Sequence, residues 1–225
     1  MAASTDQSRT GARDRYRNHV KDEVKHAALR QLADGGPQAL SVNAIAKELG
    51  MSGPALYRYF TGRDDLLTEL VLDAYADLAD ALTVAGARGA GLAPPDRLRA
   101  VAHAYRRWAL DQPHRYVLLY RPPLPGYDAH ADQLVEAAGR SMAVLLELLV
   151  DLDVEDAELP ADLAEQLQGW TARLGDRVGP PMAVRAIELW TRLHGFVDIE
   201  IGGSFASMGL DPGRLFEREV TRMLA

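Results

Sequence analysis

Side chains suited to hydrogen bonding with an anion are concentrated between residues 41 and 63. They are hydroxyl and guanidinium groups set among small residues, namely Ser41, Ser52, Tyr57, Arg58, Tyr59 and Arg63. Such donors bind phosphate oxygens and the edges of bases. The pattern therefore indicates a surface for nucleic acid more than a centre for bond-making chemistry.

Patterns typical of catalysis are not found elsewhere in the sequence. The chain has no cysteine, which excludes disulfides, thiolate zinc sites and cysteine nucleophiles. Its six histidines never occur in an HExxH arrangement, and the segment 202–206, GGSFA, lacks the final glycine and the preceding strand of a nucleophile elbow. We therefore expect no enzyme activity, no metal site and no cofactor.

Charge is distributed unevenly along the chain. The net charge is −7, but residues 1–63 carry ten basic and six acidic side chains, whereas residues 64–225 have a net charge of −11. A nucleic-acid surface is therefore expected only at the N-terminal end. Arginines 9, 13, 15 and 17 form a basic arm there, and two interpretations stay open: the arm reaches an adjacent minor groove, or it is merely solvated.

The elements that carry these side chains are predicted to be helices throughout, because no stretch alternates in the manner of a strand. The fold class is all-α with about nine helices. A first helix is predicted over 13–33 with an apolar stripe, followed by short helices over 42–49 and 53–60 that each have a serine placed as N-cap. A long helix follows to about residue 84, and its apolar stripe consists of Leu67, Leu70, Val71, Ala74, Leu78 and Leu82. Residues 85–95 are predicted as a loop.

The two short helices suit a helix-turn-helix. Ala46 is small where two helices must pass closely, and Gly50 can adopt the left-handed conformation that ends a helix. Ile45, Leu49 and Leu56 supply an apolar side toward the first helix. The second short helix would then project far enough to enter a major groove.

Residues 13–80 resemble the N-terminal domain of TetR-family repressors. The resemblance is carried by Ser41, Ile45, Ala46, Gly50, Ser52, the block Leu56 to Phe60 and the block Arg63 to Leu67. It implies phosphate contacts from Tyr57 and Arg63. A purely structural helical hairpin is the alternative.

Base reading is expected from the start of the second short helix. The resemblance places it at Ser52, Gly53, Pro54 and Ala55, with Arg58 and Tyr59 further along, while Ser41 and Ser52 add hydroxyl donors. Gly53 and Pro54 have no side-chain donor, so direct reading is sparse and DNA shape gains weight.

The C-terminal part, 190–224, resembles the WHG-type domain of a subset of TetR-like regulators, with Trp190, His194 and Gly195 at the named positions. Helix 181–201 carries two apolar stripes: Ala183, Ile187, Trp190, His194, Val197 and Ile201 form one, and Ala186, Leu189, Leu193 and Phe196 form the other. One stripe would face the chain's own core and the other a second subunit. The alternative is a helix buried wholly within its own domain.

Aromatic and other bulky side chains beyond residue 100 suit an effector pocket, although they also suit an ordinary core. The candidate ligand-binding residues are His103, Tyr105, Trp108, Tyr116, Tyr120, Tyr127, Met142, Trp170, Trp190 and His194. The proline-rich segment 121–126 borders the pocket mouth or serves as a rigid connector. A hydrophobic or aromatic ligand is expected.

These observations predict a flexible arm over 1–12, a DNA-binding domain over 13–62 and an effector-binding and dimerisation domain over 63–225, in which 63–84 is the connecting helix. The expected function is a repressor that binds a palindromic DNA operator as a homodimer and is released by a small molecule. The alternative is a helical ligand-binding or adaptor module without specific DNA binding. Neither a membrane span nor a signal peptide is evident, so a cytoplasmic location is expected.

Overall fold

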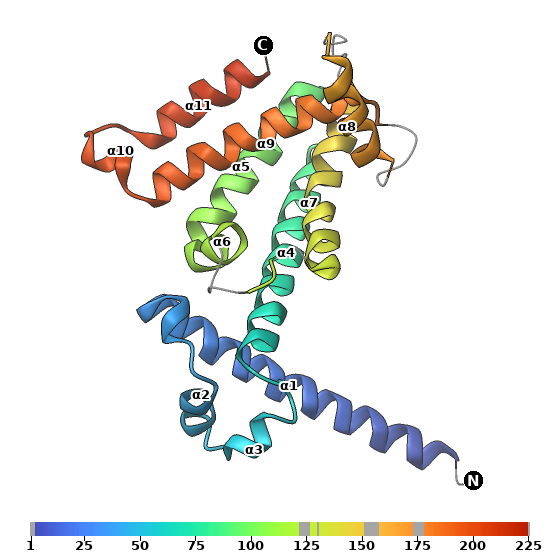
Figure 1. Ribbon diagram of the computed structural model, residues 1–225, viewed down its shortest axis with the longest axis vertical. Coiled ribbons are helices and arrows are strands. Elements are labelled where there is room, and N and C mark those ends of the chain that lie inside the picture. The colour runs from blue at the N-terminus through green and yellow to red at the C-terminus, as the bar shows by residue number, and fades with distance from the viewer. Residues whose placement is uncertain (1–2, 122–126, 130, 151–157, 173–177, 225) are drawn as a thin grey trace. The chain divides into compact units, whose positions relative to one another are not determined.

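The computed structural model describes residues 3–121, 127–129, 131–150, 158–172 and 178–224, with side chains from residue 13 onward. Every regular element in these ranges is a helix, so the chain is all-α (Figure 1). The elements are α1 (Ala3–Gly35), η1 (Pro37–Ala39), α2 (Val42–Glu48), α3 (Gly53–Leu56), α4 (Arg63–Arg88), α5 (Pro94–Asp111), α6 (Pro113–Tyr120), α7 (Asp132–Val150), α8 (Ala161–Thr171), α9 (Pro180–Ile201), α10 (Ser204–Ser207) and α11 (Pro212–Met223). Apart from the single-turn helices α3 and α10, nine α-helices are described, in line with the expected number.

The chain divides into two compact units. The first contains residues 1–74 and 114–134, and the second contains residues 75–113 and 135–225. This division differs from the predicted domains, because α6 and the residues after it belong to the first unit. α4 contributes its beginning to the first unit and its remainder to the second.

The first unit is built on the apolar stripe of α1. The predicted stripe of Val20, Val24, Ala27, Ala28 and Leu32 is buried throughout. α1 begins at Ala3, ten residues before the expected start, so residues 3–12 continue the helix. The helix ends at Gly35 and Gly36, and Gly36 takes the left-handed φ of 69°.

The turn between α2 and α3 has the predicted geometry. Gly50 has a φ of 65°, its amide donates to the carbonyl of Lys47, and the Met51 amide donates to the carbonyl of Ala46. These two bonds form a Schellman motif, which satisfies carbonyls left unpaired at the end of α2. Ala46 is buried, as expected for a residue at a close helix contact.

α4 follows the prediction in pattern but is longer. All six predicted stripe residues, Leu67, Leu70, Val71, Ala74, Leu78 and Leu82, are buried. The helix continues to Arg88, so the loop before α5 is shorter than predicted.

The second unit is arranged around α9. α9 packs against α5, α8, α10 and α11, and α11 turns back beside α9 (Figure 1). The Arg106 guanidinium of α5 donates two hydrogen bonds to the Glu200 carboxylate of α9, at 2.7 and 2.5 Å, and also lies over the Phe216 ring of α11. No helix in the described part of the chain is long and apolar enough to cross a membrane.

The buried side of α9 is a single seam drawn from both predicted stripes. It consists of Ala183, Ala186, Leu189, Leu193 and Val197. The outer members, including Ile187, Trp190 and His194, are half-buried. The seam lies between the two predicted stripes, because it takes Ala183 and Val197 from one and Ala186, Leu189 and Leu193 from the other.

Candidate nucleic-acid interface

Ser41 and Ser52 begin α2 and α3 as N-caps, as predicted. The Oγ of Ser41 accepts from the amide of Ala44, and the Oγ of Ser52 accepts from the amide of Ala55, each at 3.3 Å. A hydroxyl that accepts from an amide still has its own proton to donate. Both serines can therefore stabilise a helix and also donate to a phosphate.

Residues 53–60, here called the recognition segment, were predicted as one helix. In the structure the α-helix is shorter and the residues after it form a tighter turn. α3 ends at Leu56, and the chain continues in bonds of the i to i−3 kind, from the Arg58 amide to Ala55 and from the Tyr59 amide to Leu56. Gly53 at its start and the aromatic residues Tyr57, Tyr59 and Phe60 after it are weak helix formers, which accounts for the short helix.

The polar residues that follow α3 differ in how exposed their side chains are. Tyr57 and Arg58 are exposed, Tyr59 is half-buried, and Leu56 and Phe60 are buried against the unit. Gly53 has open space beside it, since an added Cβ would meet only the Oδ1 of Asn43 at 3.6 Å. The front of the recognition segment is therefore bare, and its polar groups stand at its C-terminal end.

Arg63 is engaged with the protein. Its guanidinium donates to the carbonyl of Pro37 in η1, while its buried Nε has no hydrogen-bond partner in the described part of the chain. The side chain thus fastens the start of α4 to the segment between α1 and α2. The resemblance implied a phosphate contact here, and that role stays a prediction.

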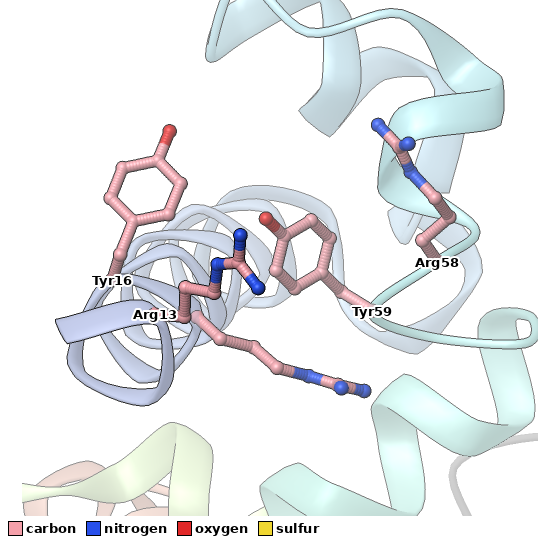
Figure 2. A pocket seen from close by; sticks show the side chains of 5 residues that line it. Arg13, Tyr16, Arg58 and Tyr59 are labelled. Carbon is pink, nitrogen blue, oxygen red and sulfur yellow. The ribbon is translucent and has the colours of Figure 1, made fainter. Parts of the chain in front are cut away.

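A basic cleft lies between α1 and the turn after α3. Its lining consists of Arg13, Tyr16, Arg17, Arg58 and Tyr59, and its volume is about 450 Å³. Figure 2 shows the Tyr59 ring extending toward α1, with Arg13 and Tyr16 on one side of it and Arg58 on the other. Of these five, sequence reasoning missed Tyr16, although its spacing from Arg13 and Arg17 places all three on one helical face.

An ion-pair network joins α1 to the first half of α4, and sequence reasoning also missed it. The Lys25 Nζ lies 2.8 Å from carboxylate oxygens of Glu69 and of Asp73, and the Lys21 Nζ lies 3.1 Å from Glu69. The hydrogen bond from Lys25 lowers the pKa of Glu69, against an opposing effect of burial. Burial lowers the pKa of Lys25, but hydrogen bonds to Asp73 and Glu69 outweigh it and leave the pKa raised.

The ten predicted ligand-binding residues are divided between the two units. Tyr116, Tyr120 and Tyr127 lie in the first unit, where the Tyr127 hydroxyl is 3.1 Å from the hydroxyl of Thr68 on α4. The other seven lie in the second unit: His103, Tyr105, Trp108, Met142, Trp170, Trp190 and His194. Tyr105, Trp108 and Tyr116 are buried.

Two of these residues, His103 and Trp108, share a groove in the second unit. It lies between the second half of α4 and α5 and has a volume of about 530 Å³. Aliphatic side chains line it together with Asp77, Asp111, Arg88 and Arg107. The indole Nε1 of Trp108 donates to the Oδ2 of Asp77 at 3.0 Å.

Trp190 and His194 are paired on α9. Their rings stack with centroids 5.3 Å apart, and burial lowers the pKa of His194 against a smaller opposing effect of Asp198. Within the described ranges, no group of three or more histidine, aspartate or glutamate side chains is placed to hold a metal ion. The predicted pocket-mouth segment lies mostly outside the described residues, at 122–126.

Comparisons with known proteins agree with this architecture. The family model of bacterial regulatory proteins of the tetR family matches residues 26–70, and that of the tetracyclin repressor-like C-terminal domain matches residues 98–223. The HTH-type transcriptional regulator Rv1816 of Mycobacterium tuberculosis is 34% identical, with 96% of this chain and 95% of that protein covered. The uncharacterized HTH-type transcriptional regulator Rv0681 of the same organism is 28% identical, with 100% and 94% covered.

Solved structures show the same fold. The crystal structure of the regulatory protein SCO4313 is 42% identical and has a TM-score of 0.79, with 94% of this chain and 98% of that chain covered. The fatty acid degradation regulator FadR from Bacillus halodurans has a TM-score of 0.62 at 16% identity, with 91% and 94% covered, and so shares the fold. The chain belongs to the TetR family of DNA-binding transcriptional regulators.

Proposed function

We propose that this protein is a cytoplasmic repressor that binds a palindromic operator as a homodimer and leaves it when a small hydrophobic or aromatic molecule binds. The observation that carries the proposal is the capped helix-turn-helix, whose exposed Tyr57 and Arg58 stand in the positively charged part of an acidic protein. A net positive reading end attracts phosphates, while the acidic remainder does not compete with it for DNA.

Exposed apolar side chains at the end of α9 and after α10 support the homodimer. Ile199 is 45% exposed, Met208 is 64% exposed and Leu210 is 45% exposed. A second copy would cover these side chains by two-fold symmetry, since symmetric dimers use the same patch on each subunit. A dimer also presents two recognition segments about 34 to 36 Å apart, which is one turn of DNA.

The groove between α4 and α5 supports an effector. Its volume of about 530 Å³ is in the range of small-molecule sites, and it offers the Trp108 edge and aliphatic walls. α4 begins at Arg63 in the first unit and continues without interruption to the residues that line this groove. A ligand that favours a different setting of α4 would lower operator affinity, and linkage requires the operator to lower ligand affinity equally.

Selection of bound duplexes from a random DNA pool tests the DNA-binding function. The expected result is an enriched palindrome whose affinity falls steeply with salt, because phosphate contacts release counterions. Weak binding without sequence preference at every salt concentration would instead support a ligand-binding or adaptor module that has lost specific DNA recognition.

Operator titration with and without a ligand tests the release mechanism. Candidate hydrophobic and aromatic compounds are first screened for a shift in the melting temperature of the free protein. A compound that binds should weaken operator affinity by about fivefold or more, the usual range of allosteric coupling. Equal operator affinities with and without the bound compound would contradict release by a ligand.

A further inference from the structure

The cleft between α1 and the turn after α3 has the chemistry of a site for a polyanion. Arg13, Tyr16 and Arg17 face it from α1, and Arg58 and Tyr59 face it from the turn (Figure 2). Tyr16 is 65% exposed, so an aromatic ring stands in solvent beside guanidinium groups. Aromatic rings next to arginines are typical of surfaces that bind nucleic-acid strands.

Positive charge in the cleft is not balanced by any acidic side chain that the structure describes from residue 13 onward. Among the described side chains, no carboxylate lies within ion-pair distance of Arg13, Arg17 or Arg58. By contrast, Lys21 and Lys25, further along α1, are paired with Glu69 and Asp73. Three unbalanced guanidinium groups repel one another, and a bound anion removes that repulsion.

We propose that this cleft holds the sugar–phosphate backbone of the operator duplex at the flank of each half-site. Arg13 and Arg17 bind phosphate oxygens, and the rings of Tyr16 and Tyr59 flank the deoxyribose. The volume of about 450 Å³ exceeds the needs of a single phosphate ion, and Arg58 lies two residues after the end of α3, so a strand that passes α3 continues into the cleft. This inference rests on the proposed DNA-binding function and extends it to a second contact region.

The inference changes the role of Tyr59. Sequence reasoning placed Tyr59 among the base-reading residues, but its half-buried ring points toward α1 and forms a wall of the cleft. Arg58 then stands between the two contact regions. Discrimination among operators would depend on phosphate spacing at the flank as well as on the sparse base contacts at α3.

Salt titrations of operator affinity test the proposal, with the duplex enriched from a random pool as the probe. The variant R13A/R17A removes both phosphate donors of α1, and R15A is the matched control because Arg15 is exposed on the opposite side of the helix and does not line the cleft. The slope of log affinity against log salt should fall by about 2 per subunit in R13A/R17A, since each lost phosphate contact removes about 0.9. R15A should change it by much less, and R13K/R17K should restore it.

Neutral phosphates in the DNA locate the contact. Methylphosphonates placed one at a time along the operator flank should weaken wild-type binding at one or two positions and leave R13A/R17A unaffected there. If R13A/R17A lowers helicity, R13K/R17K serves as the test, because it keeps the positive charge and the helix: it should show the same sensitivity to methylphosphonates as the wild type.

Two results would overturn the inference while the DNA-binding function stands. One is an R13A/R17A slope equal to that of R15A. The other is an arginine effect that follows the A·T content of the flank and ignores phosphate neutralisation, which would indicate minor-groove insertion. Absence of sequence-specific binding by the wild-type protein would overturn the DNA-binding function and this inference together.

Discussion

Two glycines of the helix-turn-helix differ in whether the backbone requires glycine. Gly50 has a φ of 65° and makes the turn possible, whereas Gly53 has no positive φ and has room for a side chain. G53A should therefore stabilise the protein by about 0.5 kcal/mol by restricting the unfolded chain, and G50A should destabilise it by about 1 to 2 kcal/mol. Urea unfolding followed by circular dichroism measures both changes.

G53A also tests how bare the reading face is. An added methyl group at the front of α3 offers an apolar contact for a thymine methyl, so selection from a random pool should return a changed preference at one operator position. An unchanged operator preference would mean that residue 53 stays away from the major groove.

Arg63 illustrates a side chain whose partner the sequence does not reveal. Its bond to the Pro37 carbonyl predicts that R63A loses about 1.5 to 3 kcal/mol of unfolding free energy, because a charged donor bound to a carbonyl contributes that much. R58A is the matched control: Arg58 is exposed and outside any described ion pair, so it should lose operator affinity with little loss of stability. If R63A were as stable as the wild type, the bond to Pro37 would not stabilise the fold, and phosphate binding would be the only role left for Arg63.

For single residues, a hydrogen bond or backbone conformation could be predicted where the partner lies close by in the sequence. The caps at Ser41 and Ser52 and the left-handed Gly50 are of this kind, because each partner lies within five positions. The Arg63 bond spans 26 positions and depends on how α1 and α4 come together. No spacing rule of a helix or turn reaches that far, and the sequence could only indicate a basic residue at a helix start.

At the scale of elements, the ion pairs between α1 and α4 predict a pH-dependent stability. The pKa of Glu69 is lowered in the folded protein, so the carboxylate contributes stability above its unfolded pKa near 4.5, and this contribution is lost as the pH falls through the lower folded value. E69Q should therefore be less stable than the wild type at pH 7, and the gap should narrow as the pH falls below 4.5.

Urea unfolding at pH 7 and pH 4 measures that gap. E48Q is a suitable control, because among the described side chains Glu48 pairs with Arg30 alone, whose side chain is 60% exposed. Exposed pairs contribute little, so E48Q should track the wild type at both pH values. A constant gap between E69Q and the wild type across the range would show that the network acts through packing and not through charge.

Elements were predicted well where one face is buried. The stripes of α1 and α4 follow directly from helical spacing, and every residue assigned to them is buried. α9 was harder to predict, because apolar residues surround much of the helix and the sequence does not rank them by burial. The buried seam includes the small residues Ala183 and Ala186 as well as Leu189 and Leu193. α3 was predicted too long, since its aromatic residues look helical by pattern while their propensity is weak.

The whole molecule could be predicted only in outline. An all-α regulator follows from the sequence, but the grouping of 114–134 with the N-terminal unit does not. That grouping also assigns Tyr116, Tyr120 and Tyr127 to the first unit and the other candidate ligand residues to the second. Aromatic content indicates where bulky rings occur along the chain, but tertiary contacts decide which of them share a site.

At the scale of the whole molecule, the proposed homodimer can be tested by placing charges in the surface that would be buried between the two copies. The variant I199E/M208E places two charges among the exposed apolar side chains at the end of α9 and after α10. Burying them against a second copy would cost several kcal/mol, so the variant should sediment as a monomer with unchanged helicity. V135E is the matched control, because Val135 is similarly exposed on α7.

Operator affinity should fall together with the dimer. A monomer binds one half-site at a time and loses the effective concentration that the second subunit supplies, so its affinity should drop by about a hundredfold or more. V135E should keep both the dimer and the affinity. If I199E/M208E still sediments as a dimer, the two subunits meet on another face; if it is monomeric and binds as tightly as the wild type, operator recognition does not require a pre-formed dimer.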